Sequence, residues 1–413
     1  MRLRSAVAAI RAFLGLAALA ALAFLGYAGY LLFAPSRAST AYLPPQAPVA
    51  GFPASERLQQ VLDGYSAELG GVGLQATLIL PDGRVWTGVA GNANHERGYP
   101  LTPDHRLYIG SITKVYTAAL VMDLVAQGLI TLEDPVTRWV ELPQAHGVTV
   151  RMLLNHTSGL SSYTEDGWFL LRYFGQPGKR WEPRELLGVV LNRPLNFPPG
   201  SRHEYSNTNY LLLGMILEDV TGRPYGLLIR DLAVRLGLEA THTLIYPEQV
   251  PVATGYDQSL LRLGRRNMTR FRTSLETGAH AAGAILATSR DVARFVHALI
   301  TGELLPDMLV AEMQNFVDAR GGDVPEEQGY GLGLQQLVVA GEPYVGHRGT
   351  IPGYSSVAVH HVEKGYTFVI LSNLSVIDEL ELLKRVQEAV NPLLAAPGVE
   401  GSGSPGTSGE GPI

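Results

Sequence analysis

Residues 111–114 have the sequence Ser-Ile-Thr-Lys, and they lie where a strand-like run gives way to a helix. Residues three apart share one face of a helix, so the hydroxyl of Ser111 and the amine of Lys114 can meet. A serine hydroxyl is a poor nucleophile near neutral pH, and an adjacent amine that burial keeps partly uncharged can activate it. The stretch therefore predicts a nucleophile and its activating group on one helical turn.

A purely structural interpretation of these residues is the alternative. Ser111 would then be a helix N-cap, for which serine is preferred, and Lys114 would be solvated in the first turn. A cation in the first turn opposes the helix dipole, however. Lysine is also rare here, since the chain has only Lys114, Lys179, Lys364 and Lys384. Because lysine can release a proton that arginine retains, both facts favour a catalytic Lys114.

Two further motifs follow along the chain, Tyr205-Ser-Asn207 and His347-Arg-Gly349. In this order, the three motifs resemble those of the serine penicillin-recognising family, whose class A members carry S-x-x-K, S-D-N and K-T-G. The family includes class C β-lactamases, D-alanyl-D-alanine carboxypeptidases and related esterases. The likeness spans roughly residues 55–394. Runs that resemble the carboxypeptidase branch are LLNHTSGL (153–160), YSNTNYLLLGMILEDVTGRPY (205–225), GYGLGL (329–334) and GHRGTIPGY (346–354).

Tyr205 and Asn207 lie at the open end of a helix that an apolar stripe predicts over residues 206–220. From there a phenol can reach the nucleophile or the leaving group. We expect the pKa of Tyr205 to be lowered by a cationic Lys114, so that Tyr205 acts first as general base and then as general acid. The alternative is a rim tyrosine beside an asparagine cap.

The run 344–350 is predicted to be a strand, with glycines where another backbone approaches closely. The resemblance implies that this strand forms one wall of the site and that the backbone N–H groups of Ser111 and Thr350 form an oxyanion hole. We expect His347 to hydrogen-bond near Tyr205 or a substrate carboxylate and to make the site sensitive to pH. Glycine at 349 leaves the substrate unobstructed. The predicted substrate-binding residues are Asn207, His347, Gly349 and Thr350.

Arg348 stands where the carboxypeptidases commonly have threonine. In a strand its side chain points away from the face that His347 uses. Arg348 is therefore either structural or a change in how a substrate carboxylate is held. The resemblance consequently leaves peptidase specificity open.

Metal and cofactor signals are missing from the sequence. His360 and His361 are adjacent in a predicted strand, so they face opposite sides and cannot chelate one ion together. The chain has no H-E-x-x-H, P-loop or G-x-S-x-G motif, which are the signals of zinc peptidases, nucleotide hydrolases and α/β-hydrolases. We expect neither a metal nor a cofactor.

The N-terminal region predicts where the catalytic domain is located. Residues 1–11 carry three arginines and no acidic residue, and residues 12–34 form an apolar run long enough to cross a bilayer. Positive charge before such a run keeps the N-terminus in the cytoplasm and directs the remainder of the chain outward. We expect an uncleaved transmembrane anchor with the catalytic domain in the periplasm or at the cell surface. The alternative is a signal peptide cleaved near Ser39-Thr-Ala41.

Charge and cysteine content exclude other classes. Residues 1–53 hold four of the 32 basic residues and no acidic residue, which leaves 28 basic against 38 acidic side chains, a net charge of −10 with histidine neutral. A nucleic-acid partner would need a basic face, so none is expected. The chain has no cysteine, and a domain of this size can bury enough core for export without disulfides.

Apolar runs at both ends of the domain predict strands, and the middle is predicted to be helical. This pattern indicates an α+β fold, an antiparallel sheet flanked by helices with a large helical insertion, and the site in the cleft between the two parts. A Pro-rich tether (35–53) precedes the hydrolase domain (54–395), and a Gly/Ser-rich disordered tail (396–413) follows it. The expected strands are 74–80 and 85–89, joined at Pro81-Asp-Gly83, then 332–339, 344–347, 354–361 and 366–371, before a helix over 377–389.

These features predict a membrane-anchored serine hydrolase that works through an acyl-enzyme. Ser111 attacks a carbonyl, Lys114 and Tyr205 manage its proton, and water later releases the acyl group. The expected substrate is a small molecule or a peptidoglycan peptide, with D-Ala-D-Ala carboxypeptidase or β-lactamase-like activity ranked before a broad esterase. The remaining alternative is a sensor that binds cell-wall fragments or β-lactams without turnover.

Overall fold

The computed structural model describes residues 42–44, 52, 54–244, 250–258, 265–322 and 324–394. The expected anchor at 12–34 and the expected tail at 396–413 lie outside these residues, as does most of the tether. Within the described part of the chain, no helix is long and apolar enough to span a bilayer.

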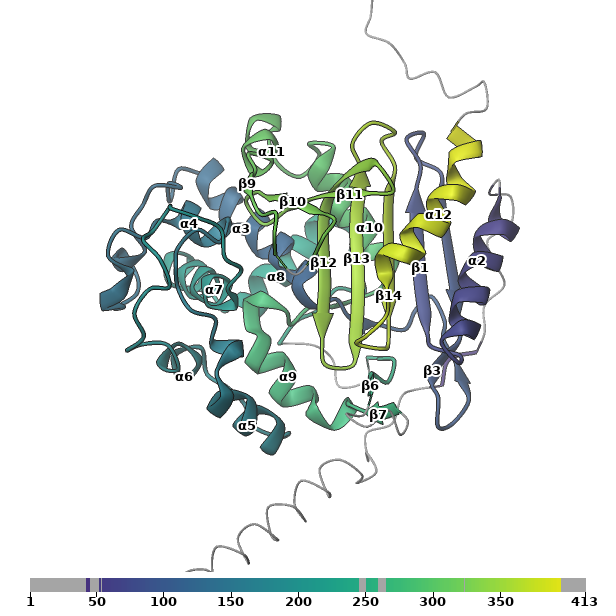
Figure 1. The fold of residues 1–413 in the computed structure, drawn as a ribbon, viewed down its shortest axis with the longest axis horizontal. Coiled ribbons are helices and arrows are strands. Elements are labelled where there is room, and N and C mark those ends of the chain that lie inside the picture. Colours follow the sequence, from purple (N-terminus) through teal and green to yellow (C-terminus); the bar gives the residue numbers. More distant parts are fainter. Residues whose placement is uncertain are drawn as a thin grey trace, which may run out of the picture.

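An antiparallel sheet of eight strands forms the centre of the molecule (Figure 1). Its strands lie in the order β2-β1-β14-β13-β12-β11-β10-β9, so the N-terminal hairpin pairs with the last strand of the chain. The hairpin turn predicted at Pro81-Asp-Gly83 is confirmed, with Gly83 at φ +82°. The strands are β1 (Leu74–Ile79), β2 (Val85–Ala90), β9 (Val317–Asp318), β10 (Glu327–Tyr330), β11 (Gln335–Val339), β12 (Glu342–Ile351), β13 (Tyr354–His361) and β14 (Thr367–Ser372).

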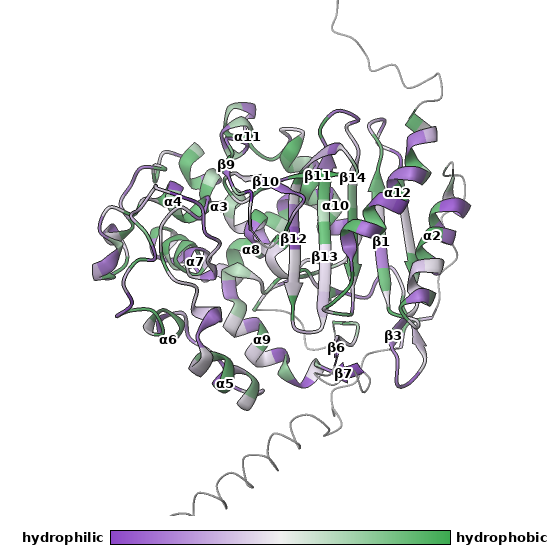
Figure 2. Ribbon diagram, viewed as in Figure 1, coloured by the Kyte–Doolittle hydropathy of each residue, from purple (hydrophilic) through white to green (hydrophobic). Residues whose placement is uncertain are grey.

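Helices cover both faces of this sheet, and the strand residues alternate between two cores as a pleated strand requires. Val357 and Val359 of β13 pack with α2 (Ser55–Glu68) and α12 (Glu379–Leu394). Ala358, between them, belongs to the core that also contains residues of α3 and α10. Figure 2 shows hydrophilic and hydrophobic residues alternating along α2 and α12, as expected of helices with one solvated side.

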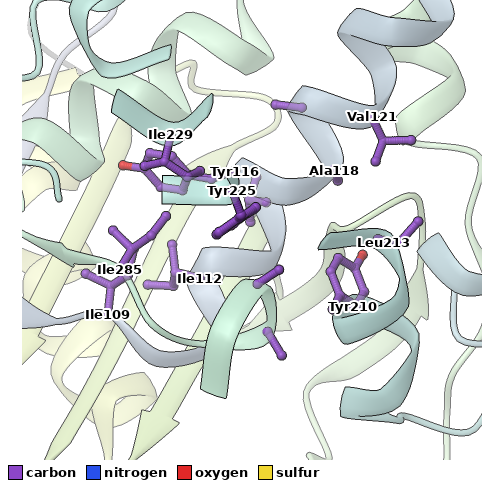
Figure 3. Packing of buried hydrophobic residues seen from close by; sticks show 14 of the residues in the cluster. Ile109, Ile112, Tyr116, Ala118, Val121, Tyr210, Leu213, Tyr225, Ile229 and Ile285 are labelled. Atoms are coloured by element: carbon purple, nitrogen blue, oxygen red, sulfur yellow. The ribbon is translucent and has the colours of Figure 1, made fainter. Parts of the chain in front are cut away.

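The helical region lies beside the sheet (left in Figure 1) and is built around α3, whose residues are buried on nearly every side. A helix that is apolar all round belongs in the interior. Figure 3 shows side chains of α3, α7 and α8 packed together in this region. The helices after α2 are α3 (Thr113–Ala126), α4 (Val150–Leu154), α5 (Gly167–Gly175), α6 (Pro183–Gly188), α7 (Asn207–Thr221), α8 (Tyr225–Leu236), α9 (Arg272–Ala279), α10 (Ser289–Ile300) and α11 (Asp307–Met313).

Short elements connect these parts. The two-stranded pairs are β3 (Asn92–Asn94) with β4 (Tyr99–Pro100), β5 (Leu107–Tyr108) with β8 (Leu286–Ala287), and β6 (Tyr256–Gln258) with β7 (Arg265–Asn267). The 3-10 turns are η1 (Gly110–Ile112), η2 (Val136–Arg138), η3 (Pro143–Ala145), η4 (Tyr163–Glu165), η5 (Thr269–Phe271) and η6 (His280–Ala282).

The expected α+β organisation, with its antiparallel sheet and helical insertion, is confirmed. Three predicted elements have other bounds. The strand expected over 344–347 extends over Glu342–Ile351, and the helix expected over 377–389 spans Glu379–Leu394. The strand expected from residue 332 begins at Gln335. Gly331 and Gly333 form a turn instead. A Cβ at Gly331 would lie 2.1 Å from the carbonyl oxygen of Met313, and Gly333 has φ +83°, a backbone conformation that favours glycine.

Candidate active site

Ser111 sits on η1, the 3-10 turn that leads from β5 into α3. Gly110 permits this turn because it has φ +51° and because a Cβ there would lie 2.9 Å from the backbone nitrogen of Thr350. The residue that caps α3 is Ile112, and no side chain makes a capping hydrogen bond. The N-cap interpretation of Ser111 is therefore wrong, and the partly exposed serine is available for another role.

Lys114 is fully buried, which overturns the alternative of a solvated lysine. Its Nζ lies 3.0 Å from Ser111 Oγ, 2.8 Å from Asn207 Oδ1 and 2.8 Å from the carbonyl oxygen of Ala282. Burial lowers the pKa of Lys114 well below its ordinary value, because desolvation disfavours the ammonium form.

The three partners of Lys114 fit a neutral amine. The carbonyl oxygens of Asn207 and Ala282 can only accept, whereas the Ser111 hydroxyl can donate or accept. A neutral amine can give its two N–H groups to the two carbonyls and take the Ser111 proton on its lone pair, whereas an ammonium ion would donate to all three oxygens. The lowered pKa of Lys114 favours the neutral form, in which the amine can act as a base for Ser111.

Tyr205 and Asn207 flank Ser206, the N-cap of α7, as the apolar stripe predicted. The Tyr205 phenol hydrogen-bonds the Ser111 side chain, and its ring lies 4.8 Å from Lys114 Nζ. The expected lowering of the Tyr205 pKa is wrong, since burial raises it. Tyr205 is thus a neutral phenol that can give a proton, and the base is better assigned to Lys114.

Asn207 is held from both ends of its amide. Its Oδ1 accepts from Lys114, while its Nδ2 donates to Thr164 Oγ1 at 2.9 Å. The backbone N–H of Asn207 donates to Ser162 Oγ at 3.1 Å. Substrate binding by Asn207 stays a prediction, but positioning of the Lys114 amine is a role that the contacts establish.

His347 lies on β12 and is buried, and its hydrogen bonds differ from the expected ones. Nδ1 contacts the carbonyl of Arg348, which can only accept, so Nδ1 carries the proton and Nε2 accepts from the Tyr330 hydroxyl at 2.8 Å. Its ring centroid is 6.3 Å from that of Tyr205, and the expected hydrogen bond near Tyr205 is replaced by the one from Tyr330. Burial and the nearby Lys114 lower the pKa of His347 to about 3, so the expected pH sensitivity near neutrality is wrong.

Gly349 and Thr350 bring β12 against the turn that carries Ser111. A Cβ at Gly349 would lie 2.2 Å from the carbonyl oxygen of Ile109 and 3.0 Å from the backbone nitrogen of Ser111. Glycine is therefore required here for backbone packing, beyond the expected clearance for a substrate. The two N–H groups of the expected oxyanion hole, on Ser111 and Thr350, lie on these adjoining segments.

Arg348 points to the other side of β12, as expected of alternate strand residues. Its guanidinium binds Glu379 of α12, at 3.0 and 3.2 Å, and Glu379 is 1 % exposed. Its backbone N–H donates to Gln335, which in turn donates to Glu327 Oε1 at 3.1 Å. Of the two alternatives for Arg348, these contacts support the structural one.

Two residues of the LLNHTSGL run support the site, although neither was among the predicted site residues. His156 has φ +58°, its Nδ1 accepts from the backbone N–H of Ser206 at 3.2 Å, and its ring centroid lies 4.3 Å from that of Tyr205. Ser158 Oγ donates to Asn209 Oδ1 at 2.6 Å. The run itself was the signal in the sequence, but only the packing shows that it holds the start of α7.

Ser111 lines two cavities. A polar groove of about 1020 Å³ is lined by Ser111, Tyr205, Asn207, Glu327, His347 and Gly349, together with charged residues from several loops. A smaller cavity of about 200 Å³ shares Ser111, Asn207 and Thr350 with the groove and is otherwise mainly apolar. All seven predicted site residues therefore converge on one region, with Lys114 buried beneath it.

Comparisons with known proteins show the family to which the chain belongs. The family model described as Beta-lactamase matches residues 58–390. Esterase EstB of Burkholderia gladioli is 30% identical over 338 residues, which cover 71% of this chain and 83% of that protein. Penicillin-binding protein 4* of Bacillus subtilis (strain 168) is 28% identical over 300 residues, 68% of this chain and 65% of that protein, so the chain spans slightly less than two thirds of it.

A solved structure is also similar to this chain, in both sequence and fold. The crystal structure of a D-stereospecific amidohydrolase from Streptomyces sp. superposes with a TM-score of 0.69 at 34% identity. The superposition covers 80% of this chain and 97% of that one. The similarity thus extends over the sheet and the helical region together.

Burial of Glu327 beside the groove leads to a prediction about stability. Burial raises the pKa of Glu327 from 4.5 to about 7, so the folded state favours the protonated form. That contribution to stability is complete below about pH 4.5 and is lost as the pH rises through about 7. Since Glu327→Gln imitates the protonated form, we expect the variant to match the parent at pH 4.5 and to exceed its free energy of unfolding at pH 8.5 by up to about 3 kcal/mol.

Urea unfolding at the two pH values measures this difference. Glu326→Gln, at the half-buried neighbouring position, is the matched control. An effect of Glu327→Gln that is the same at both pH values would contradict the prediction.

Proposed function

Since the chain belongs to the β-lactamase family of serine hydrolases, we propose that it cleaves an ester or amide bond through a covalent acyl-enzyme on Ser111. The observation that carries this proposal is the 3.0 Å contact between Lys114 Nζ and Ser111 Oγ, with the other two partners of the amine being acceptors only. When Lys114 is neutral, its lone pair can accept the proton of the nucleophile across this contact.

The first step is attack of Ser111 Oγ on the substrate carbonyl carbon. The Ser111 proton moves to Lys114 Nζ as the oxygen–carbon bond forms, and the carbonyl π electrons move to its oxygen. In this proposal the backbone N–H groups of Ser111 and Thr350 stabilise that oxyanion, and loss of one such donor typically costs about 2.7–4 kcal/mol.

The second step is departure of the leaving group. Tyr205, a neutral phenol hydrogen-bonded to Ser111, gives its proton to the leaving oxygen or nitrogen as the carbonyl reforms. The proton held by Lys114 then replaces the one that Tyr205 lost. Water attacks the acyl-enzyme by the same route in reverse, which releases the acid and restores Ser111.

The charges of the groove favour esters and amides over substrates that carry a carboxylate. Arg348 lies between His347 and Gly349 on β12, and its guanidinium already forms an ion pair with the buried Glu379. Among the described residues, the other arginines that line the groove, Arg202 and Arg320, form exposed pairs with nearby acids. A bound carboxylate is normally held by a charge-assisted hydrogen bond. We therefore rank an esterase or amidase before a D-Ala-D-Ala carboxypeptidase or a β-lactamase.

Two of the three relatives described above support this order. One is named as an esterase and one as a D-stereospecific amidohydrolase, whereas the third is named as a penicillin-binding protein. The similarity of the esterase and of the amidohydrolase to this chain extends over most of the fold in which the groove lies. The proposed substrate is thus a small ester or amide, and no metal or cofactor enters the proposed chemistry.

We further propose that the enzyme is anchored in the membrane through residues 12–34, with its catalytic domain outside the cytoplasm. The support is the sequence alone, an apolar run that follows three arginines in residues 1–11. Export would place the groove among extracytoplasmic substrates.

Ser111→Ala tests the nucleophile. We expect the variant to lose covalent labelling by a fluorescent fluorophosphonate and to lose turnover of p-nitrophenyl esters by about 10⁴-fold or more, because triad-type nucleophiles have effects of this size. Ser161→Ala, whose hydroxyl contacts Asn196, is the control and should retain both. Normal turnover by Ser111→Ala would overturn the proposal, and labelling without turnover in the parent would favour a binding protein.

Lys114→Arg tests the base. Arginine keeps its proton at all accessible pH values, so we expect kcat/KM to fall about 10²- to 10⁴-fold. In the parent, kcat/KM should rise with pH through the lowered pKa of Lys114, because only the neutral amine accepts the Ser111 proton. Lys179→Arg, in a pair with Glu185, is the control. Near-parental activity of Lys114→Arg with an unchanged pH profile would exclude Lys114 as the base.

Fractionation of expressing cells tests the anchor. The full chain should remain in the membrane pellet after an alkaline carbonate wash, and external protease should digest the catalytic domain in intact spheroplasts. A variant that lacks residues 1–34 should appear in the supernatant. Recovery of the full chain in the supernatant after the carbonate wash would contradict a spanning anchor.

A further inference from the structure

The smaller cavity at Ser111 has a chemistry of its own, and the inference from it rests on the function proposed above. We propose that this cavity, here called the acyl lobe, binds an aromatic or branched apolar group on the acyl side of the substrate. The residues that define the acyl lobe are Tyr163, Phe169, Leu170, Tyr173, Phe174 and Ile351.

The position of Tyr205 decides which part of the substrate enters the lobe. Tyr205 lines the polar groove and does not line the acyl lobe, whereas Ser111 and Thr350 line both. The leaving group must take its proton from Tyr205, so it lies in the groove. Because the two substituents of a carbonyl point in different directions, the acyl substituent is then directed into the lobe.

The walls of the lobe are mainly apolar, and several of their polar side chains already have partners. The Tyr163 hydroxyl donates to the Gly278 carbonyl oxygen at 2.6 Å, and Thr164 Oγ1 accepts from Asn207. None of the described residues that line the lobe is charged. A charged substituent there would lose its hydration without gaining a partner, so the lobe selects an apolar one.

The size of the lobe limits the apolar group. Its volume is about 200 Å³, and a cavity of roughly 150 Å³ accommodates benzene. One ring or a branched chain of similar size fits within this volume, which a long fatty acyl chain exceeds. The rings of Phe169 and Tyr173 are buried, with centroids 5.4 Å apart, and provide an aromatic surface for such a group.

The segment 278–283 joins the lobe to the catalytic lysine. Gly278 and Ala279 line the lobe, while the carbonyl oxygen of Ala282 accepts from Lys114. A Cβ at Gly278 would lie 2.7 Å from Cε2 of Tyr173, so the Tyr173 ring packs directly on this backbone. The aromatic wall and the hydrogen-bond acceptor of the base are thus supported by the same few residues.

Hydrolysis of p-nitrophenyl acetate, phenylacetate and palmitate by the full chain tests the inference, because the three esters differ only in the acyl group. We expect kcat/KM for the phenylacetate to exceed that for the acetate by about tenfold or more, the selectivity typical of an apolar pocket. We expect the palmitate to be the poorest substrate.

Two variants examine the lobe directly. Ala279→Leu should fill the lobe and lower the phenylacetate-to-acetate ratio of kcat/KM by about tenfold. Leu170→Ala, at the 37% exposed rim, should lower the ratio severalfold without disturbing the core. Its matched control is Leu171→Ala, a neighbouring leucine that is 47% exposed and lies outside the lobe, and it should leave the ratio unchanged.

The outcomes separate this inference from the proposed function. Labelling and turnover with no preference among the acyl groups, or equal effects of Leu170→Ala and Leu171→Ala, would overturn the acyl lobe and leave the serine hydrolase in place. Absence of both labelling and turnover with every ester would overturn the proposed function and the lobe with it.

Discussion

The burial of one amine, that of Lys114, is the constraint on which the site depends. Removing an ammonium ion from water costs several kcal/mol even after the protein relaxes, so the group either gains ideal partners or gives up its proton. Three segments distant in sequence provide the partners, at Ser111, Asn207 and Ala282. The folded state therefore positions α3, α7 and the turn after α9, and the burial that brings them together lowers the pKa of the amine.

The second requirement is close approach of two backbones, the turn η1 and the edge of β12. Glycine is needed on both sides, because a Cβ at Gly110 or at Gly349 would meet backbone atoms of the other segment at 3.1 Å or less. The eight-residue register between β12 and β13 holds the β12 side in place, and β13 is buried along its whole length. The sheet thus sets the position of the Thr350 backbone relative to the serine.

Much of this could be predicted from the sequence, and the failures have a common cause. The motifs correctly predicted that Ser111, Lys114 and Tyr205 lie close together. The spacing of Ser111 and Lys114 along one helical turn and the resemblance to a known family carry that information. The pKa of Tyr205, the partner of His347 and the apolar wall around Tyr173 could not be predicted. Each depends on burial by residues far away in the sequence, and apolar periodicity alone shows that a residue is buried without showing what surrounds it.

Segment 278–283 lines the acyl lobe and also contacts Lys114, so it links the substrate's acyl group to the catalytic region. An apolar group in the acyl lobe displaces water from the side of Ser111 that the lobe shares with Asn207 and Thr350. Lys114 itself is already fully buried, and its lowered pKa is due to that burial. A substrate that fills the lobe therefore acts on the surroundings of the nucleophile and on the orientation of the carbonyl, while the charge of the base is set by the fold. In this arrangement, binding energy from a part of the substrate that does not react contributes to the chemical step.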